Sequence, residues 1–164
     1  MIKSNDPKGK MSSFDRFDLD SVAAIIFRSD CRYLLQHREN RPDISYPNKW
    51  CLFGGARERN EPAEDALRRE MMEELSFSIN ECIPFLSCTF EALMEGRLTR
   101  KIFFAVRTTK REAESMVLRE GQGMAWLRFE EILARGHQLV ANDLGVIALH
   151  YQSLNGPRHL LDLS

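Results

Sequence analysis

Short apolar stretches, separated by turn and loop residues, fill the first third of the chain. Residues 21–27 (SVAAIIF) are rich in β-branched side chains and are predicted to form a buried strand. Ser29-Asp30 then supplies a turn, and residues 33–36 (YLLQ) are predicted to return as the second strand of a hairpin. Residues 37–48 are charged and contain two prolines, which is typical of a loop. A hairpin followed by a long connection is therefore expected here.

The strongest helical pattern begins at Pro62, since proline is common at the first position of a helix. From Pro62 to Leu75 the chain has no glycine and no further proline, and helix-forming residues dominate. The apolar stripe of this segment, at helical spacing, consists of Ala63, Ala66, Leu67 and Met71. A short apolar strand, residues 50–53, precedes it and runs into Gly54-Gly55.

A second hairpin and several shorter elements are predicted beyond the strong helix. Two apolar runs, residues 83–93 and 98–106, flank Glu95-Gly96 and are expected to pair as antiparallel strands. Residues 108–120 are polar and irregular, with room for a short turn of helix.

The last part of the chain predicts one strand and two helices. Residues 124–127 form a short strand, and residues 130–135 a short helix that Gly136 stops. Asn142 or Asp143 can cap a final helix that runs to about Tyr151. Strands on both sides of one strong helix, with hairpins and a terminal helix, indicate the α/β (α+β) class, with a mixed sheet covered by helices.

Length and charge narrow the classes of protein to which this chain can belong. Its 164 residues fit one domain, and 43% apolar with 29% charged residues is an ordinary globular balance. Lys plus Arg number 23 against 24 Asp plus Glu, a formal charge of −1 that favours neither nucleic-acid polymers nor membranes as partners. No stretch is long enough to span a bilayer, and the polar N-terminus lacks the apolar core of a signal peptide.

These features lead us to expect a cytoplasmic protein of one domain. The predicted boundaries are a flexible N-terminal arm over residues 1–19, the domain over residues 20–155 and a short tail over residues 156–164. The four cysteines have no CxxC spacing and no histidine partner typical of a zinc site, so free thiols in a reducing compartment are expected.

Three carboxylates of the strong helix carry the first hint of chemistry. Glu70, Glu73 and Glu74 lie at i, i+3 and i+4, which places them on one patch of helix surface. Such like charges repel, and a divalent hard cation such as Mg²⁺ or Mn²⁺ would remove the conflict. Taken alone, the same pattern is also typical of a solvated acidic helix face.

The residues around these carboxylates decide between the two interpretations. From Gly55, five residues lead to Glu61, and seven more lead to residues 69–77 (REMMEELSF). This pattern resembles the Nudix box: Gly, five residues, Glu, seven residues, Arg-Glu, an aliphatic residue, any residue, Glu-Glu, any residue, Gly and an aliphatic residue. Every charged position is matched, whereas Ser76 replaces the last glycine and Phe77 the last aliphatic residue.

The resemblance extends over about residues 21–151 and implies a Nudix-type α/β/α sandwich. It also implies a Mg²⁺-dependent hydrolase of nucleoside diphosphates linked to another group, in which Mn²⁺ can take the place of Mg²⁺. A MutT-like nucleoside triphosphate pyrophosphohydrolase, releasing a nucleoside monophosphate and pyrophosphate, is the first expectation. The alternatives are nucleotide sugars, ADP-ribose or dinucleoside polyphosphates as substrates, or a non-catalytic nucleotide-binding sensor.

The resemblance also implies roles for particular residues. It makes the metal ligands Glu70, Glu73, Glu74 and Glu120, of which Glu73 and Glu74 form the core, while the identity of the general base stays open. It makes Arg69 a positioning residue that pairs with Glu61 and so orients a ligand.

Four further residues are expected to bind the substrate: Arg38, Gly54, Gly55 and Asn142. Arg38 would contact phosphate and Asn142 a purine edge; the alternatives are a solvated loop arginine and a helix N-cap. The partner expected is a nucleotide-type small molecule, with a homodimer left open.

Overall fold

The computed structural model describes residues 19–92 and 97–155. The predicted N-terminal arm, apart from Leu19, and the predicted C-terminal tail lie outside the described residues. Within the described ranges, no helix combines the length and apolar character required to cross a membrane.

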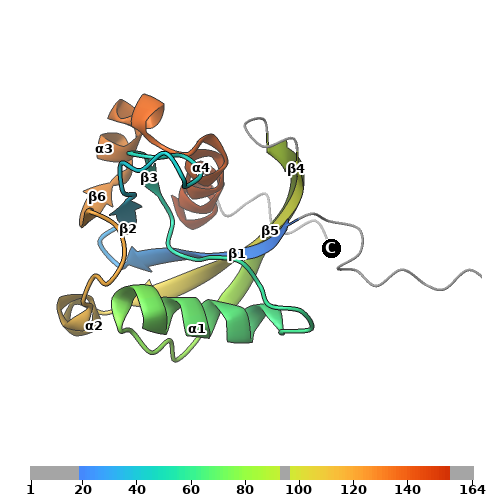
Figure 1. The fold of residues 1–164 in the computed structure, drawn as a ribbon. Helices are drawn as coiled ribbons and strands as arrows, with labels where there is room; N and C mark the ends of the chain where they lie inside the picture. The colour runs from blue at the N-terminus through green and yellow to red at the C-terminus, as the bar shows by residue number, and fades with distance from the viewer. Residues whose placement is uncertain (1–18, 93–96, 156–164) are drawn as a thin grey trace, which may run out of the picture.

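A mixed sheet forms the centre of the molecule (Figure 1). Its strands are β1 (Leu19–Arg28), β2 (Arg32–His37), β3 (Trp50–Cys51), β4 (Ile83–Ala92), β5 (Arg97–Thr108) and β6 (Gly123–Arg128). The strand order is β3-β2-β1-β5-β4, and β6 pairs with β2. β1 and β5 run parallel over ten residue pairs, whereas β4 and β5 form the predicted antiparallel hairpin. The predicted fold class is confirmed.

Helices cover both faces of this sheet, as Figure 1 shows for α1 on one side and α4 on the other. The helices are α1 (Ala63–Leu75), α2 (Lys110–Ser115), α3 (Phe129–Ala134) and α4 (Ala141–Asn155), with a 3-10 helix at Gly136–Gln138. Thr109 and Glu112 form a capping box that starts α2, within the segment predicted to hold a short helical turn.

The apolar run of β1 is continuous because both faces of the central strand are buried. Val22, Ala24 and Ile26 pack into the core beneath α1, together with Leu67 and Met71 of that helix. The intervening residues of β1, Ala23 and Ile25, pack into a second core that contains Val146 and Ile147 of α4. Alternate residues of β1 thus pack against α1 on one face and α4 on the other, which gives three layers: a helix, the sheet and a helix.

Three predicted element boundaries were wrong. Pro62 is the residue before α1 and not its first residue. Gly136 does not end a helix but begins the 3-10 helix, because α3 already ends at Ala134. α4 begins at Ala141 and continues to Asn155, so Asn142 and Asp143 lie inside its first turn and neither is the N-cap.

Candidate functional site

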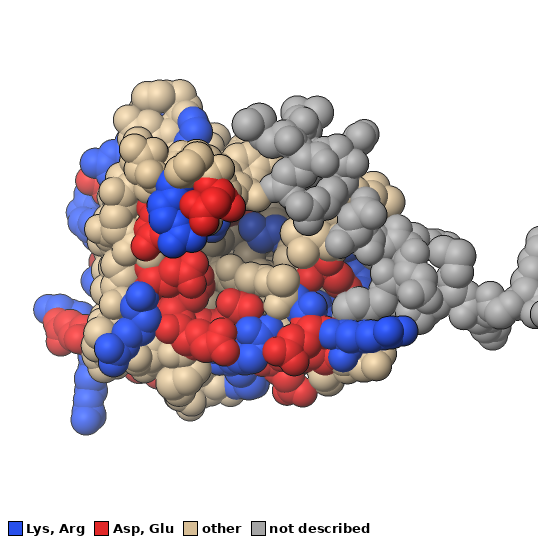
Figure 2. Space-filling model, in the orientation of Figure 1, with Lys and Arg blue, Asp and Glu red and all other residues tan. Residues whose placement is uncertain are grey.

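A cavity of about 230 Å³ opens between the sheet and the start of α4. All four residues predicted to bind substrate line it: Arg38, Gly54, Gly55 and Asn142. Figure 2 shows this hollowed face of the molecule, with acidic side chains gathered over α1 along one edge of the hollow. Residues that are far apart in the sequence thus meet at one opening.

The double glycine brings backbone to positions that a side chain would block. Gly54 has φ +137°, and a Cβ there would lie 2.2 Å from the Val22 carbonyl oxygen. A Cβ on Gly55 would lie 2.5 Å from the Glu70 carboxyl group. The backbone N–H of Gly54 donates to Oε2 of Glu74 at 2.8 Å. The glycines therefore let the strand end pass directly against two carboxylates of α1.

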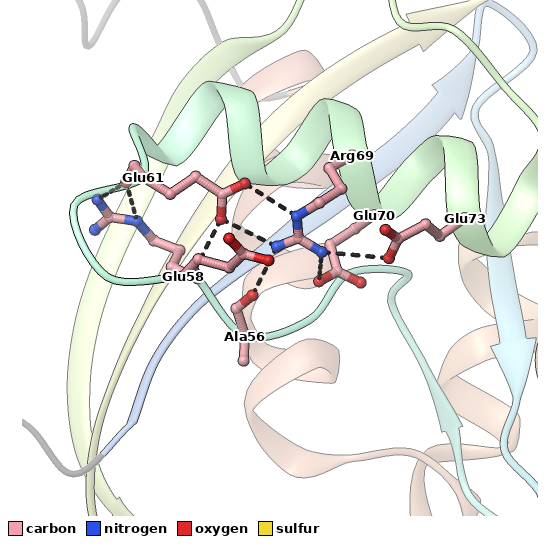
Figure 3. A network of polar contacts seen from close by, with 7 residues as sticks. Ala56, Glu58, Glu61, Arg69, Glu70 and Glu73 are labelled. Carbon is pink, nitrogen blue, oxygen red and sulfur yellow. Dashed lines mark hydrogen bonds and ion pairs between the residues drawn. The ribbon is translucent and has the colours of Figure 1, made fainter.

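Arg69 is the centre of a partly buried ion-pair network along α1 (Figure 3). Its guanidinium makes two hydrogen bonds to Glu61, Nε to Oε1 and Nη2 to Oε2, each 3.0 Å long. Its Nη1 reaches Glu70 Oε1 at 2.7 Å and Glu73 Oε2 at 3.3 Å. Nη2 also donates to the Ala56 carbonyl oxygen, which joins α1 to the segment after the glycines. The predicted Arg69–Glu61 pair is present.

Glu74 is a buried carboxylate of α1, with 5% of the residue exposed. Burial, together with the charges of Glu120 and Glu70, raises the pKa of Glu74 to about 8, although the hydrogen bond from Gly54 acts in the opposite direction. Burial likewise raises the pKa of Glu70, against the lowering effect of Arg69. The charge of Glu120 thus acts on both Glu70 and Glu74, and these three carboxylates, Glu70, Glu74 and Glu120, are here called the acidic cluster.

The loop that carries Glu120 is tied to the end of α1 by backbone hydrogen bonds. The N–H groups of Val117 and Arg119 donate to the Leu75 and Glu74 carbonyl oxygens at 2.8 and 2.7 Å. Gln36 of β2 contacts both this loop and α1, because its Nε2 donates to the Glu120 carbonyl oxygen at 3.1 Å and to Glu74 Oε1 at 3.4 Å.

Ser76, the departure from the box glycine, has φ +48° and ψ +36°, the left-handed conformation. This is the geometry for which glycine is preferred at the end of a helix. Its hydroxyl accepts a hydrogen bond of 2.9 Å from Arg119 Nε, in the loop that carries Glu120. The serine thus keeps the helix end intact and adds a contact to that loop.

The chemistry of these donors fits a hard divalent cation. The acidic cluster offers several carboxylate oxygens, which are the ligands that Mg²⁺ and Mn²⁺ select. The side chains are not yet gathered around one point: the described residues hold no group of three or more His, Cys, Asp or Glu arranged to bind a metal. Glu70 instead pairs with Arg69, and Glu74 with Gly54.

Two predicted residues lie toward the solvent side of the site. The Glu73 side chain is 60% exposed, and Arg69 is its ion-pair partner at 3.3 Å. Arg38 donates from Nε to the Ser45 carbonyl oxygen at 2.9 Å, so its guanidinium leans on the loop before β3. Arg38 also lines a second, adjoining pocket with Glu120 and Gln36, which joins the cavity to the acidic cluster.

The sequence analysis missed a charged pair that forms part of the cavity wall. Asp143 of α4 is completely buried and accepts from the backbone N–H of Leu52 at 2.9 Å. Its other oxygen accepts a hydrogen bond of 2.9 Å from Lys101 Nζ of β5. The only signal in the sequence was a lysine within an apolar strand, and nothing in the spacing connected it to an aspartate 42 residues later.

Known proteins resemble this chain in sequence and in fold. Residues 18–146 match the family model of the NUDIX domain. A nucleoside triphosphatase, NudI, from Salmonella paratyphi B is 28% identical over 142 residues, which cover 82% of this chain and 94% of the relative.

Two solved structures share the fold. A MutT protein from Methanosarcina mazei Go1 has a TM-score of 0.70 and 23% identity, over 85% of this chain and 96% of that one. The NUDIX domain of NrtR from Shewanella oneidensis, solved with ADP ribose, has a TM-score of 0.68 and 16% identity, over 92% and 94% of the two chains.

Proposed function

Because the chain belongs to the Nudix family and is a hydrolase of pyrophosphate bonds, we propose that it is a MutT-like nucleoside triphosphate pyrophosphohydrolase. It converts a nucleoside triphosphate and water into a nucleoside monophosphate and pyrophosphate. The observation that carries the proposal is the position of the acidic cluster beside the cavity, with Gly54 and Gly55 between them. The nucleoside triphosphatase name of the Salmonella relative supports this choice among pyrophosphate substrates.

Nudix hydrolases generally use divalent metal ions, and we assign Mg²⁺ to this site, with Mn²⁺ as a substitute. Glu70, Glu73, Glu74 and Glu120 would hold it, with the buried Glu74 as the central ligand. When bound, the ion neutralises charge on phosphoryl oxygens and lowers the pKa of a water molecule that attacks phosphorus. The Gly54 N–H donor fixes one oxygen of Glu74 and leaves its other oxygen directed to Gln36.

Arg69 acts through the carboxylates that it orients. Its two hydrogen bonds to Glu61 lock the guanidinium plane, and its remaining N–H group then aligns Glu70 and Glu73. Such a bidentate pair gives directional control that a lysine could not provide. Arg69 is therefore a positioning residue in this proposal and does not touch the substrate.

The two ends of the substrate are assigned to the two pockets. Arg38 lines both of them and is placed to hold phosphate oxygens with its guanidinium, once these compete with the Ser45 carbonyl for it. Asn142, at the start of α4, faces the cavity, where its amide can donate to and accept from a base edge. The homodimer left open above stays a prediction, which light scattering would test.

A substrate panel tests the proposal. The purified protein is incubated with Mg²⁺ and, separately, with nucleoside triphosphates, ADP-ribose, nucleotide sugars and dinucleoside polyphosphates, and products are separated by ion-exchange chromatography. We expect a monophosphate and pyrophosphate from triphosphates, at a higher kcat/KM than for any other class. Release of inorganic phosphate and a diphosphate, or faster cleavage of another class, would contradict it.

A further inference from the structure

Lys101 has an unusual position, with its ammonium group inside the wall of the cavity. It comes from β5, whereas Asn142 and Asp143 come from the first turn of α4, and all three line the same space. The Lys101 side chain is 19% exposed, so it is largely enclosed but keeps a surface toward the cavity. A charged donor is therefore available beside the amide of Asn142.

The ion pair with Asp143 holds this ammonium group in one place. The Nζ atom of Lys101 donates to Asp143 Oδ1 at 2.9 Å, and the Leu52 N–H fixes the other oxygen of Asp143 at 2.9 Å. Burial by itself would lower the pKa of Lys101, but the Asp143 carboxylate more than offsets this and raises it. Lys101 is thus a permanent cation whose position is set by a buried partner.

Most of the hydrogen-bonding capacity of this ammonium is unused. A lysine carries three N–H donors and no acceptor. Among the described residues, Asp143 is the one hydrogen-bond acceptor of Lys101, and Nζ lies 5.2 Å from the centre of the Phe103 ring. Cys51 and Arg38 also lie near enough to influence the pKa of Lys101. The remaining donors can therefore serve a ligand in the cavity.

We infer that Lys101 is a specificity-determining residue that donates a hydrogen bond to a carbonyl oxygen of the nucleobase. The inference rests on the proposed function, since it takes the cavity as the place of the base. It predicts a preference for bases with a keto group at purine position 6 or pyrimidine position 4 over bases with an amino group there.

The preference follows from the donors on each side. A keto oxygen accepts from the ammonium, whereas an exocyclic amino group would present its own N–H donors to a cation and leave both unsatisfied. Discrimination of this kind is large because the wrong base leaves the remaining N–H donors of the enclosed ammonium without an acceptor. Hydrogen bonds to charged groups correspond to roughly a 10- to 100-fold effect on kcat/KM.

The arrangement of the cavity agrees with this placement of the base. Gly54 and Gly55, which border the acidic cluster, line one part of the cavity, and Lys101 lines it together with Asn142. Phosphates held near the acidic cluster would leave the base at the side of α4. Tyr46 and Phe90, which also line the cavity, offer aromatic surface to a flat ring.

Matched pairs of substrates test the inference. The kcat/KM ratio is measured for inosine against adenosine triphosphate and for uridine against cytidine triphosphate, which differ at the keto or amino position. We expect the wild type to favour at least one keto substrate by about 10-fold or more, and Lys101→Met to bring that ratio close to unity by lowering the keto rate.

Two further variants guard the result against effects on folding. Lys101→Met leaves Asp143 buried without its cation, so the double variant Lys101→Met/Asp143→Asn is measured as well; its asparagine oxygen can still accept from Leu52. Lys110→Met, at an exposed residue of α2 outside the cavity, is the matched control and should keep the wild-type ratio.

Nucleotide binding separates a failure of this inference from a failure of the proposed function. The dissociation constants of inosine and adenosine monophosphate are measured by calorimetry, which requires no turnover. A preference for inosine monophosphate that is lost in both Lys101 variants supports the inference even if triphosphates are poor substrates. Equal binding and equal turnover of keto and amino members by the wild type would overturn it, as would a keto preference that survives Lys101→Met.

Discussion

The α1 side and the α4 side of the site differ in how completely their charged groups are paired. On the α1 side, burial and the charges of Glu120 and Glu70 raise the pKa of Glu74, and Arg69 is shared between Glu61, Glu70 and Glu73. On the α4 side, the buried Asp143 has one cation, Lys101, and one backbone donor. The first side is short of positive charge, whereas the second is balanced.

The difference indicates which side of the site is suited to bind a charged ligand. Buried carboxylates that outnumber their cationic partners are costly for the folded protein, and such sites are typical of function. A balanced buried pair already satisfies its own charges and can instead offer directional hydrogen bonds. The α1 side is therefore assigned to a metal ion and the phosphates, and the α4 side to the base.

The largest expected effect comes from the α1 side. Glu74→Gln removes the proposed central ligand but keeps a side chain of the same size that can still accept from Gly54. Turnover should fall roughly 100- to 1,000-fold, the range for losing a group that stabilises transition-state charge. Steady-state kinetics with Mg²⁺ measure it, and circular dichroism should show an unchanged fold.

The matched control for this variant is Glu64→Gln, on the exposed first turn of the same helix. It should leave turnover within about twofold of the wild type, since surface substitutions act weakly. Wild-type rates in both variants would remove Glu74 from the site.

On the balanced side, the corresponding change should act on stability first. Asp143→Ala leaves the Leu52 N–H and the Lys101 ammonium without their acceptor. The free energy of unfolding should drop by about 3–5 kcal/mol, as expected when one partner of a buried pair is removed. Urea denaturation measures it, with Asp43→Ala in the exposed loop as control. A loss as small as that of Asp43→Ala would show that the pair is solvated.

A buried histidine of α4 gives the stability of the protein a predicted dependence on pH. His150 of α4 is 3% exposed, its Nδ1 lies 3.1 Å from the Tyr33 hydroxyl, and burial lowers its pKa from 6.5 to about 4. The unfolded chain therefore takes up a proton at a higher pH than the folded protein does. The contribution of His150 to stability is complete above about pH 6.5 and is lost as the pH falls toward about 4.

The loss over this pH window should reach up to about 3 kcal/mol. The free energy of unfolding is measured at several pH values for the wild type and for His150→Gln, which does not titrate but can still accept from Tyr33. We expect the wild type to lose more stability on acidification than the variant. Parallel pH profiles would mean that His150 is protonated equally in both states.

The smallest expected effect concerns Ser76, at the end of α1. Ser76→Gly relieves the left-handed conformation, worth about 1 kcal/mol, but gives up the exposed hydrogen bond from Arg119. The free energy of unfolding should rise by about 0.5 kcal/mol, because the two effects partly cancel. Ser76→Ala, which loses the hydrogen bond without relieving the backbone, should fall below the wild type in thermal denaturation.

Much of the fold could be predicted because it depends on local patterns. The β-branched run of β1 predicts a buried strand, and the apolar stripe of α1 predicts a helix and the face that it buries. Helix ends were harder: Asn142 and Asp143 have the side chains of N-caps, yet Asp143 is drawn to Leu52 and Lys101 by tertiary contacts. The contacts of the buried Asp143 carboxylate therefore outweighed its local preference for the N-cap position.

The site was predictable where its residues share one helix. Helical geometry sets how Glu70, Glu73 and Glu74 lie on α1, whereas the pair of Arg69 with Glu61, which precedes the helix, came from the resemblance to the Nudix box. Lys101 could not be placed, since its neighbours depend on how β5 and α4 meet in space. Pairings across a fold leave no trace in the spacing of a single sequence.

Metal binding itself tests the central claim most directly. Isothermal titration of Mg²⁺, and of Mn²⁺ followed by electron paramagnetic resonance, is carried out on the wild type and on Glu74→Gln without nucleotide. The acidic cluster predicts saturable binding by the wild type, with proton release near neutral pH as Glu74 gives up its proton, and much weaker binding by the variant. Equal binding by the two proteins, or none by the wild type even when nucleotide is added, would contradict the account.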